Sequence, residues 1–375
     1  MASSGMESFQ YGEVRIQLLD SPAEPGILIT PSSTAPAYIF KLPSAAGPGL
    51  ISNCKLSYSM DETAFSGVFG FEVPGLTIQQ VAEIKASGFV QFIAGYENLP
   101  GREPRTMFYG TVDHIEPRFE YGKLRWSFTC KAAISELFSI RFPISGQTIA
   151  SDGRSAIRFT VEDGFKAVEA ALGIRVIYPL YASGIATTIP SAPGFVPKQE
   201  DEDFLDLVSI PDYSENTTAL VHIRNFVAIL QSAILKRFGI TRRIAYAAEA
   251  QEMETPTTRL FVADLDTSEN FVFLDIDMDS PFVMGGGPTT STEQESFENA
   301  EGDVQTETAS STGFTLVTPF NPDMIPSTIV RARSEQLAAL WVWPPTEIQH
   351  EFPVTGGWRT QAKGSIQRTE DEVVV

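Results

Sequence analysis

The sequence predicts an α+β fold that is rich in β-strands. The chain of 375 residues contains 26 Phe, 28 Gly and 25 Pro, a mixture that favours strands and turns over helical bundles. Apolar and polar residues alternate toward both ends of the chain, whereas helical spacing is confined to a few segments. Strands that are not regularly separated by helices argue against a doubly wound parallel sheet.

The first predicted unit contains strands and a short helix. Residues 54–59 and residues 69–73 alternate between apolar and polar side chains, as half-buried strands do. Thr77 and Gln80 have the spacing of a capping box, so a helix should follow them. The helix should lead into a strand over residues 89–96.

Residues 107–131 predict a β-hairpin with its turn at residues 120–122. One side of the return strand is apolar and comprises Leu124, Trp126, Phe128 and Cys130. The opposite side carries Lys123, Arg125 and Lys131. A cationic side fits either contact with an acidic neighbour or a solvent-exposed face, and we favour the exposed face.

The middle of the chain predicts two helices separated by a loop. Thr160 and Asp163 cap a helix that Gly173 ends, and a strand follows over residues 174–178. Residues 183–203 are rich in Pro, Ser and Thr and then acidic, which indicates a long loop. The longest predicted helix has apolar residues at helical spacing, namely Leu220, Ile223, Val227, Leu230, Ile234 and Phe238.

Short strands are predicted again in the last third, at residues 244–247, 260–263, 271–278, 314–317, 329–333 and 340–343. Residues 285–312 are polar, acidic and nearly free of aliphatic side chains. We expect them to form an exposed and partly mobile loop. Residues 369–375 should form a tail.

The charge excludes several classes of protein. With 27 Lys and Arg against 47 Asp and Glu, the formal net charge is −20. Such a chain repels phosphate backbones and lacks the basic surface of a general nucleic-acid clamp or a membrane-surface helix. We therefore expect no sequence-specific nucleic-acid binding and no membrane insertion. The first residues carry no signal-peptide pattern, so we also expect a chain that is neither secreted nor anchored.

The cysteine and histidine residues do not form a local metal motif. Cys54 and Cys130 are too few for a disulfide framework, and two buried thiols are the default expectation, with a bridge between them as the alternative. The three histidines lie far apart in sequence, at His114, His222 and His350. We predict no metal site from them.

One acidic run resembles the opening of a calcium loop. Asp275, Asp277 and Asp279 place oxygen ligands at alternate positions, but Ser280 and Gly286 stand where the template needs Gly and Glu. A solvated strand face explains the alternation, and we prefer that interpretation.

The sequence predicts no catalytic residue and no cofactor. It lacks a Gly-x-Ser-x-Gly elbow, and the acidic residues 200–203 stand in a predicted loop with no surrounding aromatic pattern to hold a sugar. One cationic cluster, at the end of the longest helix, is a candidate partner-docking site: Lys236, Arg237, Arg242 and Arg243. Complementing the helix dipole is the simpler explanation of these charges.

Three segments of the chain, taken in order, carry local patterns that match those of known proteins. The first, residues 54–96, leads through two strands and a helix into GFVQFIAGY. The second, residues 108–138, begins FYGTV and continues through a hairpin and a return strand. The third, residues 318–333, reads TPFNPDMIPSTIVRAR and is followed by His350 and the run GGWRT. Together they resemble the tail hub proteins of bacteriophages, including late control gene D proteins and the hub part of type VI secretion spikes. Ser327 stands where this family commonly has Gly.

The resemblance implies a fold and an assembly. It implies two tube-type β-barrel domains with smaller peripheral α+β domains. Three subunits would form a pseudo-six-fold ring that joins a six-fold tail tube to a three-fold central spike around a lumen for DNA. We expect the first barrel in residues 1–140, a peripheral α+β region in 141–239, and the second barrel with its insertions in 240–368.

The resemblance also implies partners and a location. The partners would be further copies of the chain, the tail tube or tube-initiator protein and the central spike protein, with tape measure and baseplate wedge proteins as further candidates. The protein would act in the tail of a virion, with a contractile tail favoured, after assembly in the cytoplasm of the bacterial host. Wall digestion would belong to another subunit, and the negative charge should line the lumen.

Two alternatives from other classes remain at this stage. One is a β-rich carbohydrate-active enzyme or cell-wall hydrolase, and the other is a carbohydrate-binding attachment protein. The ordered resemblance and the missing catalytic motif favour a structural hub protein that is not an enzyme.

Overall fold

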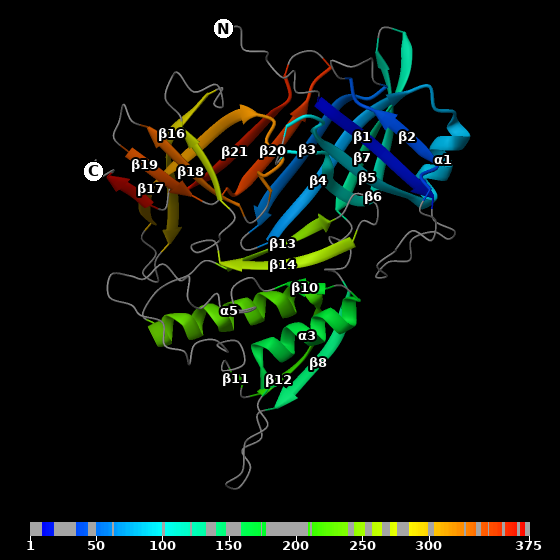
Figure 1. Cartoon of the computed structure of the whole chain (residues 1–375). Helices are drawn as coiled ribbons and strands as arrows, with labels where there is room; N and C mark the ends of the chain where they lie inside the picture. Colours follow the sequence, from blue (N-terminus) through cyan, green and yellow to red (C-terminus); the bar gives the residue numbers. More distant parts are fainter. Residues whose placement is uncertain are drawn as a thin grey trace.

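The structure is a computed structural model of the chain (Figure 1). It describes residues 10–18, 35–43, 50–61, 64–99, 102–120, 122–132, 140–147, 159–173, 175–177, 209–210, 212–238, 244–251, 257–264, 271–275, 285–298, 304–325, 328–334, 339–343, 345–354, 357–365 and 368–371.

The N-terminal strands form one half of a large sheet. They are β1 (Gln10–Leu18), β2 (Tyr38–Lys41), β3 (Ser52–Asp61), β4 (Ala64–Pro74), β5 (Gly88–Tyr96), β6 (Arg105–Glu120) and β7 (Lys123–Ala132). Their spatial order is β3-β4-β7-β6-β5-β1-β2, and every neighbouring pair is antiparallel. Helix α1 (Ile78–Ser87) buries Val81 and Ile84 in the same core as these strands.

The alternation read from the sequence explains which face of these strands is buried. Phe69, Phe71 and Val73 of β4 are inside, and Phe128 of β7 stacks on Phe71 with 4.8 Å between ring centroids. Phe92 of β5 stacks on Phe69 at 4.5 Å. Aromatic burial of this kind supplies a large share of the stability of a β-rich core.

The C-terminal strands continue the same sheet. Strand β20 (Glu347–Phe352) pairs with β3, β21 (Arg359–Ser365) pairs with β20, β17 (Val304–Pro319) pairs with β21, and β16 (Gly285–Glu298) pairs with β17. A second sheet has the order β15 (Phe271–Asp275), β18 (Ile329–Ser334), β19 (Ala339–Trp343) and β22 (Arg368–Asp371). Buried residues from both halves form one hydrophobic core, which includes Leu56, Ile348 and Trp343.

The middle of the chain lies beneath this sheet in the view of Figure 1. It contains β8 (Arg141–Gln147) paired with β12 (Asp212–Thr218), β9 (Phe159–Thr160) paired with β11 (Ser209–Ile210), and the helices α3 (Val161–Leu172) and α5 (Ala219–Phe238). Strand β10 (Arg175–Ile177) pairs with β14 (Thr257–Asp264), which pairs with β13 (Ile244–Gln251). Phe165 and Phe226 join the two helices through an edge contact at 5.6 Å.

The predicted helix caps are confirmed. The Thr77 side chain accepts from the backbone of Gln80, and Gln80 reaches back to the backbone of Thr77, which completes the capping box of α1. Thr160 and Asp163 do the same for α3, which ends at Gly173 with φ of 65°. This left-handed conformation carries no steric penalty in glycine.

Two predictions about the last third are wrong. The predicted acidic loop at residues 285–312 instead contains β16 and the first part of β17, which pair from Gly285↔Val317 to Glu298↔Val304. Its many Thr residues favour extended backbone, and β21 supplies a ladder partner for β17, so low hydrophobicity did not prevent strand formation. The predicted tail at 369–375 begins with residues of β22, which pairs with β19. The predicted loop at 183–203 lies outside the described residues.

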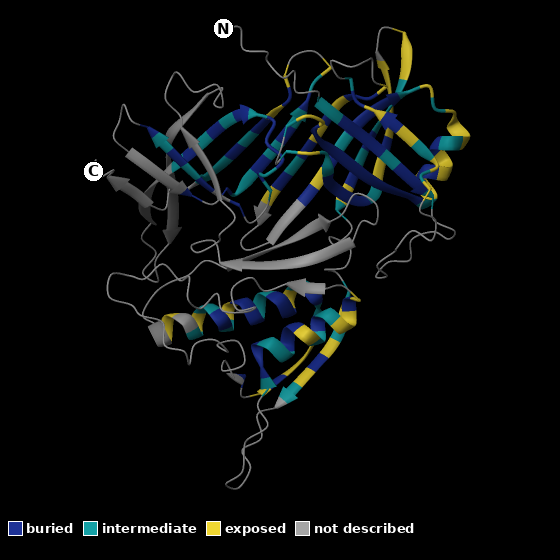
Figure 2. Cartoon of the chain, in the orientation of Figure 1, coloured by how far each residue is buried: buried dark blue, intermediate teal, exposed yellow. Residues whose placement is uncertain are grey.

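The predicted fold class is confirmed. The chain is an α+β protein rich in strands, with a large curled sheet that forms a half-barrel and few helices (Figure 1). Figure 2 shows buried residues running through β1, β5 and the neighbouring strands. Within the described residues, no helix has both the length and the apolar character needed to cross a bilayer.

Candidate functional site

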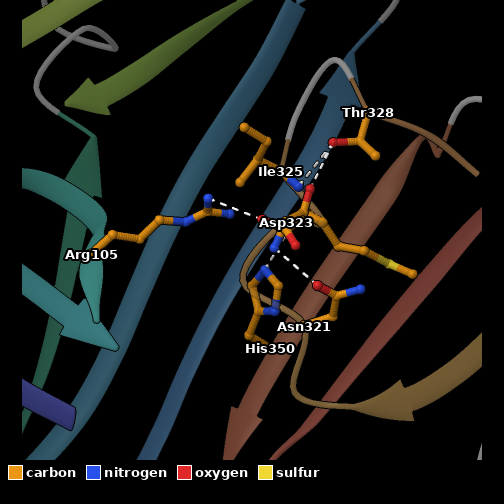
Figure 3. Close-up of polar contacts among 7 residues, drawn as sticks. Arg105, Asn321, Asp323, Ile325, Thr328 and His350 are labelled. Carbon is orange, nitrogen blue, oxygen red and sulfur yellow. Dashed lines mark hydrogen bonds and ion pairs between the residues drawn. The ribbon is translucent and has the colours of Figure 1, made fainter. Parts of the chain in front are cut away.

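The segment that follows β17 lies where the N-terminal and C-terminal strands of the large sheet meet. Residues 320–325 and Thr328 lie between β17 and β18, beside His350 of β20, as Figure 3 shows. Strand β20 pairs on one side with β3, through His350↔Leu56, and on the other side with β21, through His350↔Thr360. We call residues 320–325 and Thr328 the junction loop.

His350 holds the junction loop through both ring nitrogens. Its Nε2 lies 3.0 Å from the carbonyl oxygen of Met324, and its Nδ1 lies 2.8 Å from Oγ1 of Thr360. A carbonyl oxygen can only accept, so Nε2 carries the proton and donates to Met324. In the neutral ring Nδ1 then accepts from the Thr360 hydroxyl, whose oxygen accepts the backbone N–H of Asn321 at 2.9 Å.

Burial keeps His350 neutral. The side chain has no exposed surface, and loss of solvent lowers its pKa from 6.5 to about 3. The hydrogen bond to the Met324 carbonyl opposes this shift, and the positive charge of Arg105 adds to it. With both nitrogens engaged in this way, the imidazole positions backbone and is not free to act as a base or a metal ligand.

The loop also satisfies its own polar groups. The side-chain oxygen of Asn321 accepts the backbone N–H of Asp323 at 3.0 Å. The Thr328 hydroxyl donates to the Asp323 carbonyl at 3.0 Å and accepts the N–H of Ile325 at 3.3 Å. These bonds give several polar groups of the loop partners within the loop itself, as is usual for buried polar groups.

Side chains from β5 and β6 reach the junction loop. Nη1 of Arg105 lies 3.1 Å from Oδ1 of Asp323 (Figure 3). The Tyr96 hydroxyl donates to the carbonyl of Phe320 at 3.0 Å. The Arg105 and Asp323 side chains are both partly exposed, so the ion pair contributes on the order of 0.2–1 kcal/mol. The junction loop thus connects residues that are more than two hundred positions apart in the sequence.

The structure describes only part of the cationic cluster that the sequence predicted as a partner-docking site. Lys236 is exposed near the end of α5, and Arg237 lies in the same helix without a described side chain. Arg242 and Arg243 lie outside the described residues, so their convergence with Lys236 stays a prediction.

The acidic run ends the strand that contains Asp275. That residue is the last of β15, whereas Asp277 and Asp279 lie outside the described residues. Among the side chains that the structure describes, no group of three His, Cys, Asp or Glu residues could hold a metal ion.

The two cysteines are free and buried. Cys54 lies on β3 and Cys130 on β7, and burial raises the pKa of both thiols. The open question from the sequence is answered in favour of two thiols rather than a bridge.

Sequence reasoning noted His350 and the run that contains Thr360, but it did not predict their contact with Asn321. It also missed the second buried histidine. His222 of α5 contacts the Tyr213 hydroxyl at 2.8 Å and the Phe142 carbonyl at 2.9 Å. The signal that could have found this one was polarity, since His222 occupies the otherwise apolar face of a helix.

No family model matches the chain, and no curated protein sequence matches it. The solved structures that it resembles are tail and spike proteins. A tail protein from Neisseria meningitidis is 10% identical, with a TM-score of 0.48 over 95% of this chain and 96% of that one. The 43 kDa tail protein of prophage MuSo2 from Shewanella oneidensis is 9% identical, with a TM-score of 0.46 over 95% and 98%. A chain of the Francisella PdpA-VgrG complex is 8% identical, with a TM-score of 0.49 over 98% and 58%.

Proposed function

We propose that the chain is a structural baseplate hub protein of a phage tail. Three copies form a pseudo-six-fold ring that joins the six-fold tail tube to the three-fold central spike, and DNA passes through its lumen. Assembly takes place in the cytoplasm of the bacterial host, and the tail is of the contractile type. The role is non-catalytic.

One observation carries this proposal. The three segments with the hub pattern are far apart in sequence, yet the strands of the first two segments share one continuous sheet with β20 and β21, which carry His350 and Thr360, through the pairing of β3 with β20. Strand β18 of the third segment lies in the second sheet. The junction loop, which belongs to the third segment, is fastened to strands of the first and second segments through Tyr96 and Arg105. Three sequence segments that resembled the hub family only by chance would not be expected to lie together in this way.

The domain assignment follows from the same pattern. Residues 1–140 form the first tube-type β-barrel domain of the ring, residues 240–368 form the second with its insertions, and residues 141–239 form a peripheral α+β region. In this arrangement the tube protein and the spike protein contact opposite faces of the ring. Tape measure and wedge proteins are further partners.

The assembly is tested by measuring mass. The full chain is purified alone and with the tube and spike proteins of the same tail, and native mass spectrometry records the complexes. We expect a trimer that binds both partners. A chain that stays monomeric and enters neither complex refutes the proposal.

The cationic end of α5 is tested in the same assay. Lys236→Glu should weaken binding of an acidic partner because it reverses an exposed charge. Lys85→Glu is the matched control, since Lys85 is an exposed lysine in the last turn of α1. Equal binding by the two variants removes Lys236 from the docking site.

A further inference from the structure

The β6–β7 hairpin continues beyond the sheet to which it belongs. Strand β6 pairs with β5 only from Arg105 to Thr111, and β7 pairs with β4 only from Arg125 to Lys131. The ladder between β6 and β7 runs on to Glu120↔Lys123. Figure 1 shows the far end of this hairpin, in teal, standing clear of the sheet, and Figure 2 shows it as largely exposed.

The core-facing side of the hairpin keeps its apolar residues after the core has ended. Three cross-strand pairs occupy this side in succession: Ile115↔Phe128, Pro117↔Trp126 and Phe119↔Leu124. Phe128 is 1% exposed, Leu124 is 37% exposed and Phe119 is 77% exposed. Phe119 and Leu124 are cross-strand partners, so they expose adjacent apolar surface, and contiguous apolar surface is more typical of contact sites than a single exposed side chain is.

The hairpin is held in place at its base. The indole N–H of Trp126 donates to the Leu76 carbonyl at 3.0 Å, and Nη1 of Arg118 pairs with Glu72 at 3.3 Å. Gly122 closes the turn at φ of 73°. A preformed hairpin loses little conformational entropy on binding, which favours a role as a docking element.

The charge of the tip identifies the kind of partner. Residues 117–125 contain three basic residues against one acidic residue, in a chain of net charge −20. Lys123 is the exposed basic side chain next to the turn. A second copy of this chain, with its net charge of −20, carries the sign of charge that such a tip attracts.

We propose that the tip of the β6–β7 hairpin is a contact between subunits. Phe119 and Leu124 of one copy pack against an apolar patch of the next copy, and Lys123 faces acidic side chains around that patch. This inference rests on the proposed trimer and assigns one of its contacts.

The test compares two residues of equal exposure. Phe119 and Ile78 are each 77% exposed, but Ile78 lies on α1 and not on the hairpin. Native mass spectrometry and light scattering over a dilution series measure the concentration at which trimers dissociate. Phe119→Ser should raise that concentration about tenfold or more, whereas Ile78→Ser should leave it within about twofold.

A second measurement reads the contact directly. Phe119→p-benzoylphenylalanine in the full chain should form a photocrosslinked product with twice the mass of one chain. Two results would overturn the hairpin contact and leave the hub proposal standing, provided that the wild-type chain forms trimers. One is a Phe119→Ser trimer that dissociates at the wild-type concentration, and the other is a p-benzoylphenylalanine variant that gives no crosslink. A crosslink only to a tube or spike protein overturns the second copy as the occupant. A wild-type chain that never forms trimers refutes the trimeric hub itself.

Discussion

Nδ1 of His350 on β20 lies 2.8 Å from Oγ1 of Thr360, its cross-strand partner on β21. The same Thr360 oxygen accepts the backbone N–H of Asn321, and the other nitrogen of His350 donates to the Met324 carbonyl. One buried histidine and one threonine therefore fix the junction loop, the segment that links the C-terminal strands to β5 and β6.

Replacing His350 should destabilise the fold strongly. His350→Gln leaves a cavity and at least one buried polar group without its partner, so the free energy of unfolding should fall by about 2–4 kcal/mol. Urea unfolding followed by circular dichroism measures the change. His114→Gln is the matched control because His114 is exposed, and it should stay within about 0.5 kcal/mol of the wild type. Similar losses in both variants would contradict the role assigned to His350.

The contribution of His350 should depend on pH. Its pKa is about 3 in the folded state against 6.5 for an unperturbed side chain. Between these values the unfolded chain binds a proton that the folded chain does not, so stability is present above pH 6.5 and is lost as the pH falls toward 3.

The difference between wild type and His350→Gln isolates this effect from other titrating groups. Between about pH 7 and pH 5 the stability gap between the two proteins should narrow by about 2 kcal/mol, because one pKa unit corresponds to about 1.4 kcal/mol. Unfolding free energies at both pH values provide the measurement. A gap that stays constant means that His350 is as easily protonated in the folded protein as in the unfolded one.

The two thiols should resist modification in the folded protein. Cys54 and Cys130 are buried, and their raised pKa values keep them protonated, so both the access and the nucleophile are missing. Reaction with a disulfide reagent should be about 10³-fold slower than in the unfolded chain. Ser59→Cys provides a control thiol, since Ser59 is an exposed residue of the same strand as Cys54, and it should react fast. Rapid reaction of the wild-type thiols would show that β3 and β7 open readily.

Local patterns predicted the elements well, and long-range contacts were beyond them. The capping boxes at Thr77 and Thr160 lie within four consecutive residues, so the sequence contains all the information that they need. The strand character of residues 285–298 depends on pairing with β17, which low hydrophobicity in the sequence concealed.

The junction loop illustrates the same limit at the candidate site. The sequence pointed to its segment and to His350 through a family resemblance. It did not indicate that Arg105 would reach Asp323 or that Tyr96 would reach Phe320, because no local spacing encodes pairs this far apart. Likewise, the apolar face of the β6–β7 hairpin was correctly predicted, but only the structure shows that this face extends beyond the buried core at Leu124.

The N-terminal and C-terminal strands of the large sheet should unfold together. Phe352 of β20 contacts the rings of Phe92, Phe320 and Trp358, in each case with 5.0 Å between ring centroids. Phe352→Ala should cost about 3–5 kcal/mol, whereas the exposed Val354→Ala should cost about 0.5 kcal/mol or less. Because β20 pairs with β3 inside one continuous core, hydrogen exchange should accelerate equally in the N-terminal strands β4 and β7 and in the C-terminal strands β17 and β21. Faster exchange confined to β17 and β21 would instead mean that the two halves of the sheet are independent folding units. The continuous sheet would then no longer support the hub proposal.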